Sequence, residues 1–515
     1  PTASGFMGSD KEPSPSLEGL SGLLPKSCGL RLQSGGMGRE LCTAKPFQPF
    51  VTLFSEEAVL TACTRCNPKD DCVHCDRCAC ACGCACLTAA QRRRRSSVDR
   101  VALWKERTAL YAALPEVAEQ YSVPLQHLQM LVKYVVPNSA VAAQAAFGTI
   151  TALHAPAPAP EVVEAAKAVW KAMPKSSQAK HKAPALAMLL SRFAGNTFGV
   201  DEQGHCCGLC PIISLCNHHC QPNCVMATIK GCLSLRTVRE VQAGEPLTIS
   251  YINGGGDPVL LPIFHRRTLV QRAWGFVCQC SRCTADFDDT RVFNCPTCTA
   301  EEKEGYLYAG SQDRCPGETD AAEEEQDPHE ESTGAQAAAG AWCCRSCGAA
   351  ATAEVRQQLL EAERGVYQLL HKADDGEGDD DEPQEMTTLL HTAHYLSAEV
   401  MIGQMDYISD DAEALQAVLE QLLHTEYFMY HRPTVNTILY HKQLADLYTK
   451  CDLKDRALEE HEAAYDELCQ LKGEQSEDVQ TVQQFLDSFL ITCGKATEGG
   501  PEALCGNWVR NRKAN

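Results

Sequence analysis

The grouping of its cysteines is the feature that most constrains how this 515-residue chain can fold. Many of its 31 cysteines stand in Cys-x-x-Cys pairs or Cys-x-Cys runs, the spacing with which thiolates converge on zinc. The sequence contains neither a signal peptide nor an apolar run of the ~20 residues that a membrane span needs. We therefore expect a reduced, intracellular, zinc-binding protein, located in the cytoplasm, the nucleus or both, without membrane association.

The net charge of −21 is concentrated in two acidic runs, at residues 318–331 and 374–385. Each run holds eight acidic residues and no lysine or arginine, so the simplest interpretation is two solvated loops that cannot bury apolar area. Attraction of a lysine-rich protein substrate is the alternative interpretation. Nucleic acid is not expected as a main ligand, because the only strong basic run is residues 92–95.

Changes in composition divide the chain into segments. A β-type pattern stops and later returns, with a long helical pattern between its two parts. We therefore expect an α+β fold with one β-rich domain built from two distant segments. The predicted segments are a disordered start (1–27), a first β part (28–62), a zinc-binding cysteine cluster (63–90), a helical insertion (91–190), a second β part (191–256), a cysteine-rich tail (257–285), a zinc-ribbon-like module with an acidic loop (286–350) and an all-helical domain (351–515).

The helical domain contains one stretch that matches a repeat pattern. Its small and large apolar residues have the spacing of packing positions in a tetratricopeptide repeat. One such unit cannot bury its own face, so neighbouring helical pairs at 387–408 and 412–430 are expected to stack with it. A plain helical bundle is the alternative. The matching positions are Leu444, Ala445, Tyr448, Ala457 and Ala464.

Five short motifs follow one another along the two β parts and the cysteine-rich tail. In order they read GMG at 36–38, NTF at 196–198, NHHCQPN at 217–223, GEPLTISY at 244–251 and WGFVCQCSRC at 274–283. In this order they resemble the SET-domain protein lysine methyltransferases, and within them the SMYD family, whose SET domain is split by a MYND zinc finger. The resemblance implies a SET domain, a post-SET zinc segment, a helical C-terminal domain, and S-adenosylmethionine-dependent methylation of lysine in a histone or non-histone protein.

The resemblance also implies roles for individual residues. Tyr251 corresponds to the catalytic tyrosine, and together with Phe198 and Trp274 it lines the lysine channel. Glu40 stands where the family usually has a glycine, Trp274 where relatives often have tyrosine, and His219 where they often have serine, with no role assigned to it. The implied cofactor-binding residues are Gly36, Gly38, Arg39, Asn196, Asn217, His218, Tyr251 and Phe276.

Three groups of cysteines are expected to hold about four zinc ions. The resemblance implies that Cys220 joins Cys278, Cys280 and Cys283, so that His218 is a cofactor residue and not a metal ligand. Two close pairs, with Cys315 and Cys343 as alternative ligands, form the zinc-ribbon-like set Cys295, Cys298, Cys344 and Cys347. In the MYND-like cluster the preferred grouping is Cys63, Cys66, Cys80 and Cys84 on one ion and Cys72, Cys75, Cys82 and Cys86 on the other, with a compact cluster of bridging thiolates as the alternative.

Methyl transfer from a sulfonium to an amine is an in-line displacement, so catalysis must come mostly from positioning. The amine must also be neutral, which a narrow aromatic channel favours by desolvating the ammonium. The competing function is an inactive SET-like adaptor that acts through its zinc modules and helical repeats, and a thiol-rich metal buffer is a third hypothesis. The expected partners are a protein with an accessible lysine and other proteins that bind the helical domain.

Overall fold

The computed structural model describes residues 24, 30–35, 38–63, 98–136, 150, 153–200, 206–229, 232–252, 259–317, 342–371 and 388–492. The chain divides into two compact units. The first unit contains Pro1–Asn217 and Asn223–Ile249, and the second contains His218–Pro222 and Ser250–Asn515. The predicted disordered start and most of the 63–90 cysteine cluster lie outside the described residues.

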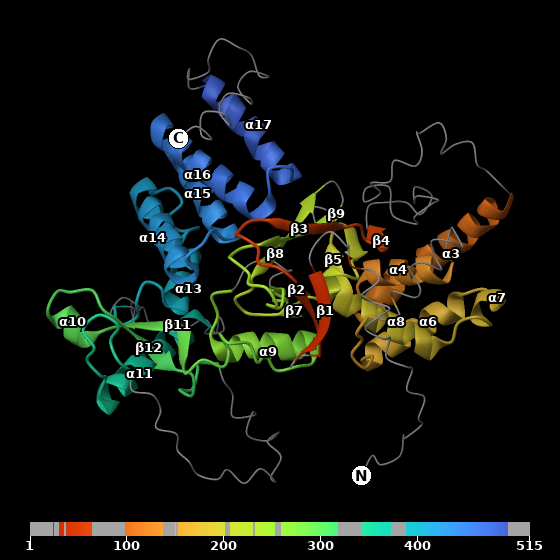
Figure 1. Cartoon of the computed structure of the whole chain (residues 1–515), viewed down its shortest axis with the longest axis horizontal. Coiled ribbons are helices and arrows are strands. Elements are labelled where there is room, and N and C mark those ends of the chain that lie inside the picture. The colour runs from red at the N-terminus through yellow and green to blue at the C-terminus, as the bar shows by residue number, and fades with distance from the viewer. Residues whose placement is uncertain are drawn as a thin grey trace, which may run out of the picture. The chain divides into compact units, whose positions relative to one another are not determined.

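The sheets of the first unit join strands that are far apart in the sequence (Figure 1). Strand β3 (Thr52–Glu56) pairs antiparallel with β9 (Cys232–Thr237), which also pairs with β8 (Cys224–Ile229). Strand β4 (Leu60–Cys63) pairs with β6 (Cys206–Leu209), which also pairs with β5 (Thr197–Gly199). One β-rich domain is therefore built from two distant segments, as the sequence predicted. The remaining two-stranded sheets are β1 (Leu30–Gly35) with β2 (Gly38–Thr43), and β7 (Asn217–His218) with β10 (Thr248–Ile249).

The helices of the first unit lie between the two β parts in sequence and pack on sheet β4-β6-β5. Apolar residues of α4 recur at helical spacing, at Leu128, Leu131, Val132 and Val135, and all four are buried. They form one core with Phe193 and with residues of β4 and β6. The helices are α3 (Val98–Tyr121), α4 (Leu125–Val135), α6 (Pro160–Ala172), α7 (Lys175–Gln178) and α8 (Ala183–Asn196).

The second unit begins with helix α9 (Ile263–Trp274) and a hairpin of β11 (Phe287–Asn294) and β12 (Tyr306–Gly310). Short helix α10 (Pro296–Ala300) connects these two strands. The C-terminal part is helical, as predicted, up to Thr492. Its helices are α11 (Ala353–Leu370), α13 (Tyr395–Gln404), α14 (Ala412–Tyr430), α15 (Val435–Lys450), α16 (Lys454–Lys472) and α17 (Glu477–Thr492).

Helices α14, α15 and α16 lie side by side (Figure 1). Ala445, Ala457 and Ala464 have no exposed surface, which lets α15 and α16 approach closely, and the pair begins at a capping box of Thr434 and Thr437. The residues that matched the repeat pattern are therefore packing positions, whereas the assignment to the tetratricopeptide class stays a prediction.

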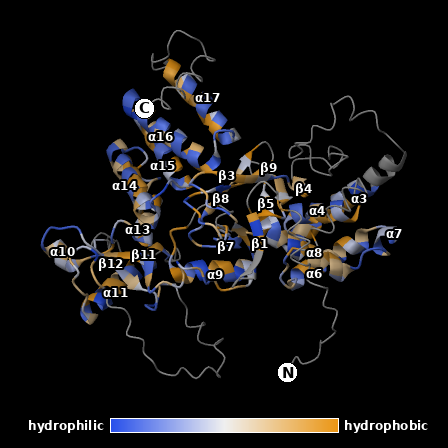
Figure 2. Ribbon diagram, in the orientation of Figure 1, coloured by the Kyte–Doolittle hydropathy of each residue, from blue (hydrophilic) through white to orange (hydrophobic). Residues whose placement is uncertain are grey.

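Hydrophilic and hydrophobic residues share these helices (Figure 2), as expected where each buries one face. Among the described residues, no helix is both long and apolar enough to cross a membrane.

A buried carboxylate holds the turn that leads into β7. Both oxygens of Glu56, on β3, accept the backbone N–H of Ile212, and one also accepts that of Ile213, at 2.9–3.1 Å. The turn continues as a short 3-10 helix, η2 (Ile213–Leu215), which ends two residues before Asn217. Burial raises the pKa of Glu56 to about 7, although the two N–H groups act in the opposite direction.

This raised pKa predicts a pH dependence of stability. The native state keeps Glu56 protonated up to about pH 7, whereas the unfolded chain ionises it near its ordinary pKa of 4.5. The stability that protonated Glu56 contributes is thus complete below pH 4.5 and is lost as pH rises through about 7. We expect the free energy of unfolding of wild type, relative to Glu56→Gln, to fall by at most about 3 kcal/mol over this range. Urea unfolding of both proteins across these pH values measures it, and a constant difference would contradict the prediction.

Candidate functional site

Aromatic rings gather around Tyr251 in the second unit. The ring centre of Tyr251 lies 5.3 Å from that of His218, 5.4 Å from Trp274 and 6.5 Å from Phe276, the last edge-on at 83°. Trp274 ends helix α9, and Gly275 follows in the left-handed region, at φ 75°, where a side chain would be strained. This C-terminal turn places the rings on both sides of Gly275 near Tyr251. The structure therefore brings together four of the residues that sequence motifs singled out.

Two hydrogen bonds fix the His218 ring, which is 2% exposed. Its Nδ1 accepts the backbone N–H of Tyr251 at 3.0 Å, and its Nε2 lies 3.2 Å from Sγ of Cys220. Phe276, by contrast, is 38% exposed, and its predicted contact with a cofactor stays a prediction. Tyr251 is half-buried between these two environments.

Four cysteine sulfurs meet beside these rings. Cys220, Cys278, Cys280 and Cys283 are all buried, and their sulfurs all lie within 4.8 Å of one another. The Cys220 sulfur lies 3.9 Å from that of Cys278 and 3.5 Å from that of Cys283. A tetrahedral zinc with Zn–S bonds near 2.3 Å needs sulfurs about 3.8 Å apart. The four residues therefore fit a structural zinc ion, and four thiolates leave no open coordination position for chemistry.

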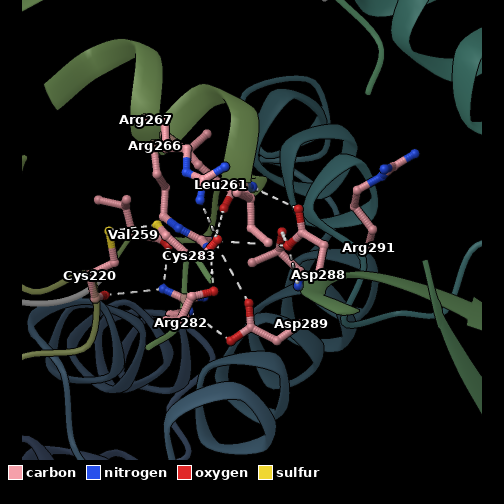
Figure 3. Close-up of polar contacts among 12 residues, drawn as sticks. Cys220, Val259, Leu261, Arg266, Arg267, Arg282, Cys283, Asp288, Asp289 and Arg291 are labelled. Carbon is pink, nitrogen blue, oxygen red and sulfur yellow. Dashed lines mark hydrogen bonds and ion pairs between the residues drawn. The ribbon is translucent and has the colours of Figure 1, made fainter. Parts of the chain in front are cut away.

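Two arginines donate to backbone carbonyls of the cysteines in this cluster, and a third lies next to one of them (Figure 3). Arg267 donates to the carbonyls of Cys278 and Cys283, at 3.2 and 2.9 Å, and Arg282 donates to that of Cys220 at 3.2 Å. Arg266 lies 3.4 Å from the carbonyl of Arg282. Such outer contacts orient metal ligands and offset the negative charge of thiolates.

Arg282 also connects the cluster to the rest of the second unit. Its Nε donates to Asp289, at the start of β11, at 2.7 Å, and its guanidinium lies 5.6 Å from the ring centre of Tyr430 on α14. The neighbouring Asp288 accepts the N–H of Ile263 at the start of α9, at 2.7 Å, and lies 3.9 Å from Arg266. Burial lowers the pKa of Arg282, but Asp289 and other neighbours raise it more, so that its net pKa is above the ordinary value.

The first unit contains the other predicted site residues. Asn217 donates its side-chain amide to the carbonyl of Arg39 at 3.2 Å. The amide nitrogen of the buried Asn196, at the end of α8, donates to the carbonyls of His154 and Arg192, at 2.9 and 2.7 Å. These bonds give Asn196 a structural role, and its contact with a cofactor stays a prediction.

The structure describes some, but not all, of the remaining predicted residues of the first unit. Phe198 lies on β5 and is half-buried, and Gly38 begins β2, whereas Gly36 lies outside the described residues. Glu40, also on β2, is 8% exposed. The roles predicted for the phenylalanine and the glycines stay predictions.

Sequence reasoning missed the roles of two residues in the NHHCQPN motif. His219 accepts the N–H of Gln221 at its Nδ1, at 2.9 Å, and its Nε2 lies 3.1 Å from Oγ of Ser281, between two cysteines of the cluster. Asn223 accepts the N–H of Thr248 at 2.8 Å and donates to the carbonyl of Pro246 at 2.8 Å, which holds the segment before β10. The motif signalled that these residues matter, but their partners are distant in sequence.

A second set of four cysteines meets in the predicted zinc-ribbon-like module. Sulfurs of Cys295 and Cys347 are 3.8 Å apart and those of Cys298 and Cys344 are 3.7 Å apart, all four within 4.8 Å. Gly305 leaves space for them, because a Cβ there would lie 2.4 Å from Sγ of Cys298. The set fits a second structural zinc. The alternative ligands, buried Cys315 and exposed Cys343, are not part of this four-sulfur set.

The MYND-like cluster is largely beyond what the structure describes. Cys63 lies at the end of β4, buried, with Cys206 opposite it in the sheet register. The grouping of its ligands and the alternative of a bridged thiolate cluster stay predictions. The cysteines outside the described residues are Cys66, Cys72, Cys75, Cys80, Cys82, Cys84 and Cys86.

Comparisons with known proteins give one family match and several similar sequences. A family model described as SET domain matches residues 38–252. The histone-lysine N-methyltransferase SMYD3 of Mus musculus is 40% identical over 82 residues, which cover 16% of this chain and 18% of SMYD3. The N-lysine methyltransferase SMYD2 of Homo sapiens is 32% identical over 112 residues, which cover 21% of this chain and 24% of SMYD2. The matched stretches thus span less than a quarter of each relative.

A solved SET domain of LSMT, described as bound to lysine and AdoHcy, aligns with 96% of this chain and 99% of its own. Its sequence identity is 12% and its TM-score 0.25, and this likeness is too weak to support the fold or a ligand.

Proposed function

We propose that this chain is an S-adenosylmethionine-dependent protein lysine methyltransferase of SMYD type. A SET-domain model matches residues 38–252, and stretches of the chain are similar in sequence to the SMYD3 and SMYD2 lysine methyltransferases. The observation that carries the proposal is the set of rings around Tyr251, directly joined to a four-cysteine cluster. Bound S-adenosylmethionine would supply an electrophilic methyl group. Everything else that the reaction needs is positioning and desolvation, which these residues can provide.

The roles follow from the chemistry of each side chain. Trp274 offers an apolar wall that desolvates the lysine ammonium and so favours the neutral amine. The Tyr251 hydroxyl can orient the lone pair of that amine. Phe276 offers an exposed ring on which an adenine could stack. The zinc cluster is structural in this scheme, since its ligands leave no open position.

The proposal also covers the other parts of the chain. The 63–90 segment is proposed to be a MYND-like module that brings the total to about four zinc ions. The helical domain is proposed to be TPR-like and to bind other proteins. The substrate is proposed to be a protein with an accessible lysine, attracted by the acidic runs, and the location to be cytoplasmic, nuclear or both.

An inactive SET-like adaptor is the second candidate, and buried Glu40 on β2 favours it. The resemblance places a glycine at this position in most of the family, and a carboxylate near the methyl donor would alter its binding. Calorimetry with S-adenosylmethionine separates the two functions. The enzyme requires binding by wild type, and the absence of any binding would leave the adaptor.

Tyr251→Phe is expected to lower the rate of methyl transfer by about one-hundredfold or more, because it removes the hydroxyl that orients the amine. Transfer of a labelled methyl group to a panel of lysine-containing proteins measures this. The control is Tyr407→Phe, since Tyr407 is 90% exposed and should leave the rate unchanged. Equal rates for wild type and Tyr251→Phe would contradict the assigned role.

A further inference from the structure

We propose that His218 is a positioning residue that couples the four-cysteine zinc site to Tyr251, an inference that rests on the proposed function only for the role of Tyr251. The buried ring bridges two groups. Its Nδ1 faces the backbone N–H of Tyr251 at 3.0 Å, and its Nε2 faces the Cys220 sulfur at 3.2 Å.

The first contact decides the tautomer of the ring. A backbone N–H can only donate, so Nδ1 of His218 must accept and carry a lone pair. The proton of the neutral ring is then on Nε2, which points to the sulfur of Cys220. His218 therefore donates an N–H···S hydrogen bond to a residue of the zinc cluster and accepts a hydrogen bond from Tyr251.

The second contact has a function if zinc is bound. Four thiolates around Zn²⁺ carry a net charge of about −2, and a donor to one sulfur lowers that charge and orients the ligand. A divalent zinc with four cysteines is already fully coordinated, so His218 acts as a support and not as a fifth ligand.

The bridge gives the zinc site two routes to the proposed catalytic residues. One runs from Cys220 through the ring of His218 to the backbone of Tyr251. The other runs along the chain from Cys278 to Phe276 and Trp274, whose rings contact Tyr251. Zinc binding to the four cysteines would therefore order the rings around Tyr251 through both routes.

Substitution of His218 by asparagine or by glutamine tests its two hydrogen bonds separately. The amide of asparagine reaches the place of Nδ1, so His218→Asn keeps an acceptor for Tyr251 but loses the donor to Cys220. The amide of glutamine reaches the place of Nε2, so His218→Gln keeps the donor and loses the acceptor. His218→Ala loses both, and Gln221→Ala, an exposed change in the same loop, is the matched control.

The first measurement is the rate at which the full-length zinc-loaded protein releases zinc to a chromogenic chelator. The kinetic phase that belongs to the Cys220-bound ion is the phase that is missing in Cys278→Ser. We expect His218→Asn and His218→Ala to release this ion about ten- to one-hundredfold faster than wild type, and His218→Gln and Gln221→Ala to release it at nearly the wild-type rate. Equal release from all five proteins would overturn the inference.

The second measurement is kcat at saturating zinc and S-adenosylmethionine, with KM recorded separately. His218→Asn should keep a higher kcat than His218→Gln, because it keeps the anchor of Tyr251. The opposite order of kcat would overturn the coupling. An unchanged kcat in both variants, with only KM for S-adenosylmethionine raised, would also overturn it and would make His218 a cofactor contact. If wild type transfers no methyl group, the proposed function fails, and the order of zinc release alone decides whether His218 supports the zinc site.

Discussion

Cys278→Ser is expected to lower the zinc content by one ion per chain, to destabilise the second unit and to abolish methyl transfer. Serine is a poor zinc ligand, and three thiolates would remain in a buried cluster that also contains Ile263 and Val270. Binding of a structural zinc contributes about 10 kcal/mol or more to folding, so losing one ligand removes a large part of the local stability. Elemental analysis, thermal unfolding and the methylation assay measure the three effects.

Two matched variants make this prediction specific. Cys451→Ser, at an exposed cysteine outside both four-sulfur sets, should change nothing. Cys298→Ser should also cost one zinc ion, but from the other set. That set does not include Cys220, which contacts His218, so binding of S-adenosylmethionine should survive better than in Cys278→Ser. Full zinc content and activity in Cys278→Ser would contradict the assignment of this cluster as a zinc site.

The cysteine clusters were predictable because ligand spacing is a local property of the sequence. Cys278, Cys280 and Cys283 lie within six residues, and only Cys220 had to be added from the resemblance. One β-rich domain built from two distant segments was likewise predictable, because β-type runs stop at one point of the chain and return at another; the pairing of β3 with β9 is how the structure joins them. Helices were recognisable from apolar spacing, as in α4, where Leu128, Leu131, Val132 and Val135 recur with the helical period.

The side chains that hold the site residues in place were not predictable, because tertiary structure determines which groups they contact. Arg282 contacts a carbonyl 62 residues earlier, a carboxylate seven residues later and a ring on α14. Nothing in the local sequence distinguishes it from a surface arginine. His219 had no predicted role, and its partner Ser281 lies 62 residues further along the chain. The motif located the site, whereas burial and long-range hydrogen bonds decided what each residue does there.

A buried ion pair supports the strand that carries Asp288 and Asp289. On β11, Arg291 makes a two-pronged contact with Glu363 of α11, at 2.8 and 2.6 Å, and both side chains are at most 2% exposed. Burial raises the pKa of Glu363, but His394 and Arg291 lower it more, so its net pKa is below the ordinary value and the carboxylate stays charged. The guanidinium also donates to the carbonyls of Asp313 and Arg314.

Glu363→Ala is therefore expected to destabilise the second unit by about 3–5 kcal/mol, because it leaves the guanidinium of Arg291 buried without its counter-ion. Glu361→Ala, an exposed change on the same helix, should cost less than about 0.5 kcal/mol. The double variant Arg291→Met, Glu363→Leu should recover most of the loss, since no uncompensated charge remains. Urea unfolding of the four proteins measures this, and equal stability of Glu363→Ala and Glu361→Ala would contradict it.

Glu363→Ala also tests whether the ion pair of Arg291 and Glu363 affects zinc binding by the Cys220 cluster. Asp288 and Asp289 precede Arg291 on β11 and bind Arg266 and Arg282, which contact the cluster. If loss of the ion pair displaces β11 and its two aspartates, Glu363→Ala should release the Cys220-bound zinc faster than Glu361→Ala does. This difference should appear well below the temperature at which either protein unfolds. Faster unfolding with unchanged zinc release would instead mean that the ion pair stabilises the unit globally while the arginines hold the cluster independently of it.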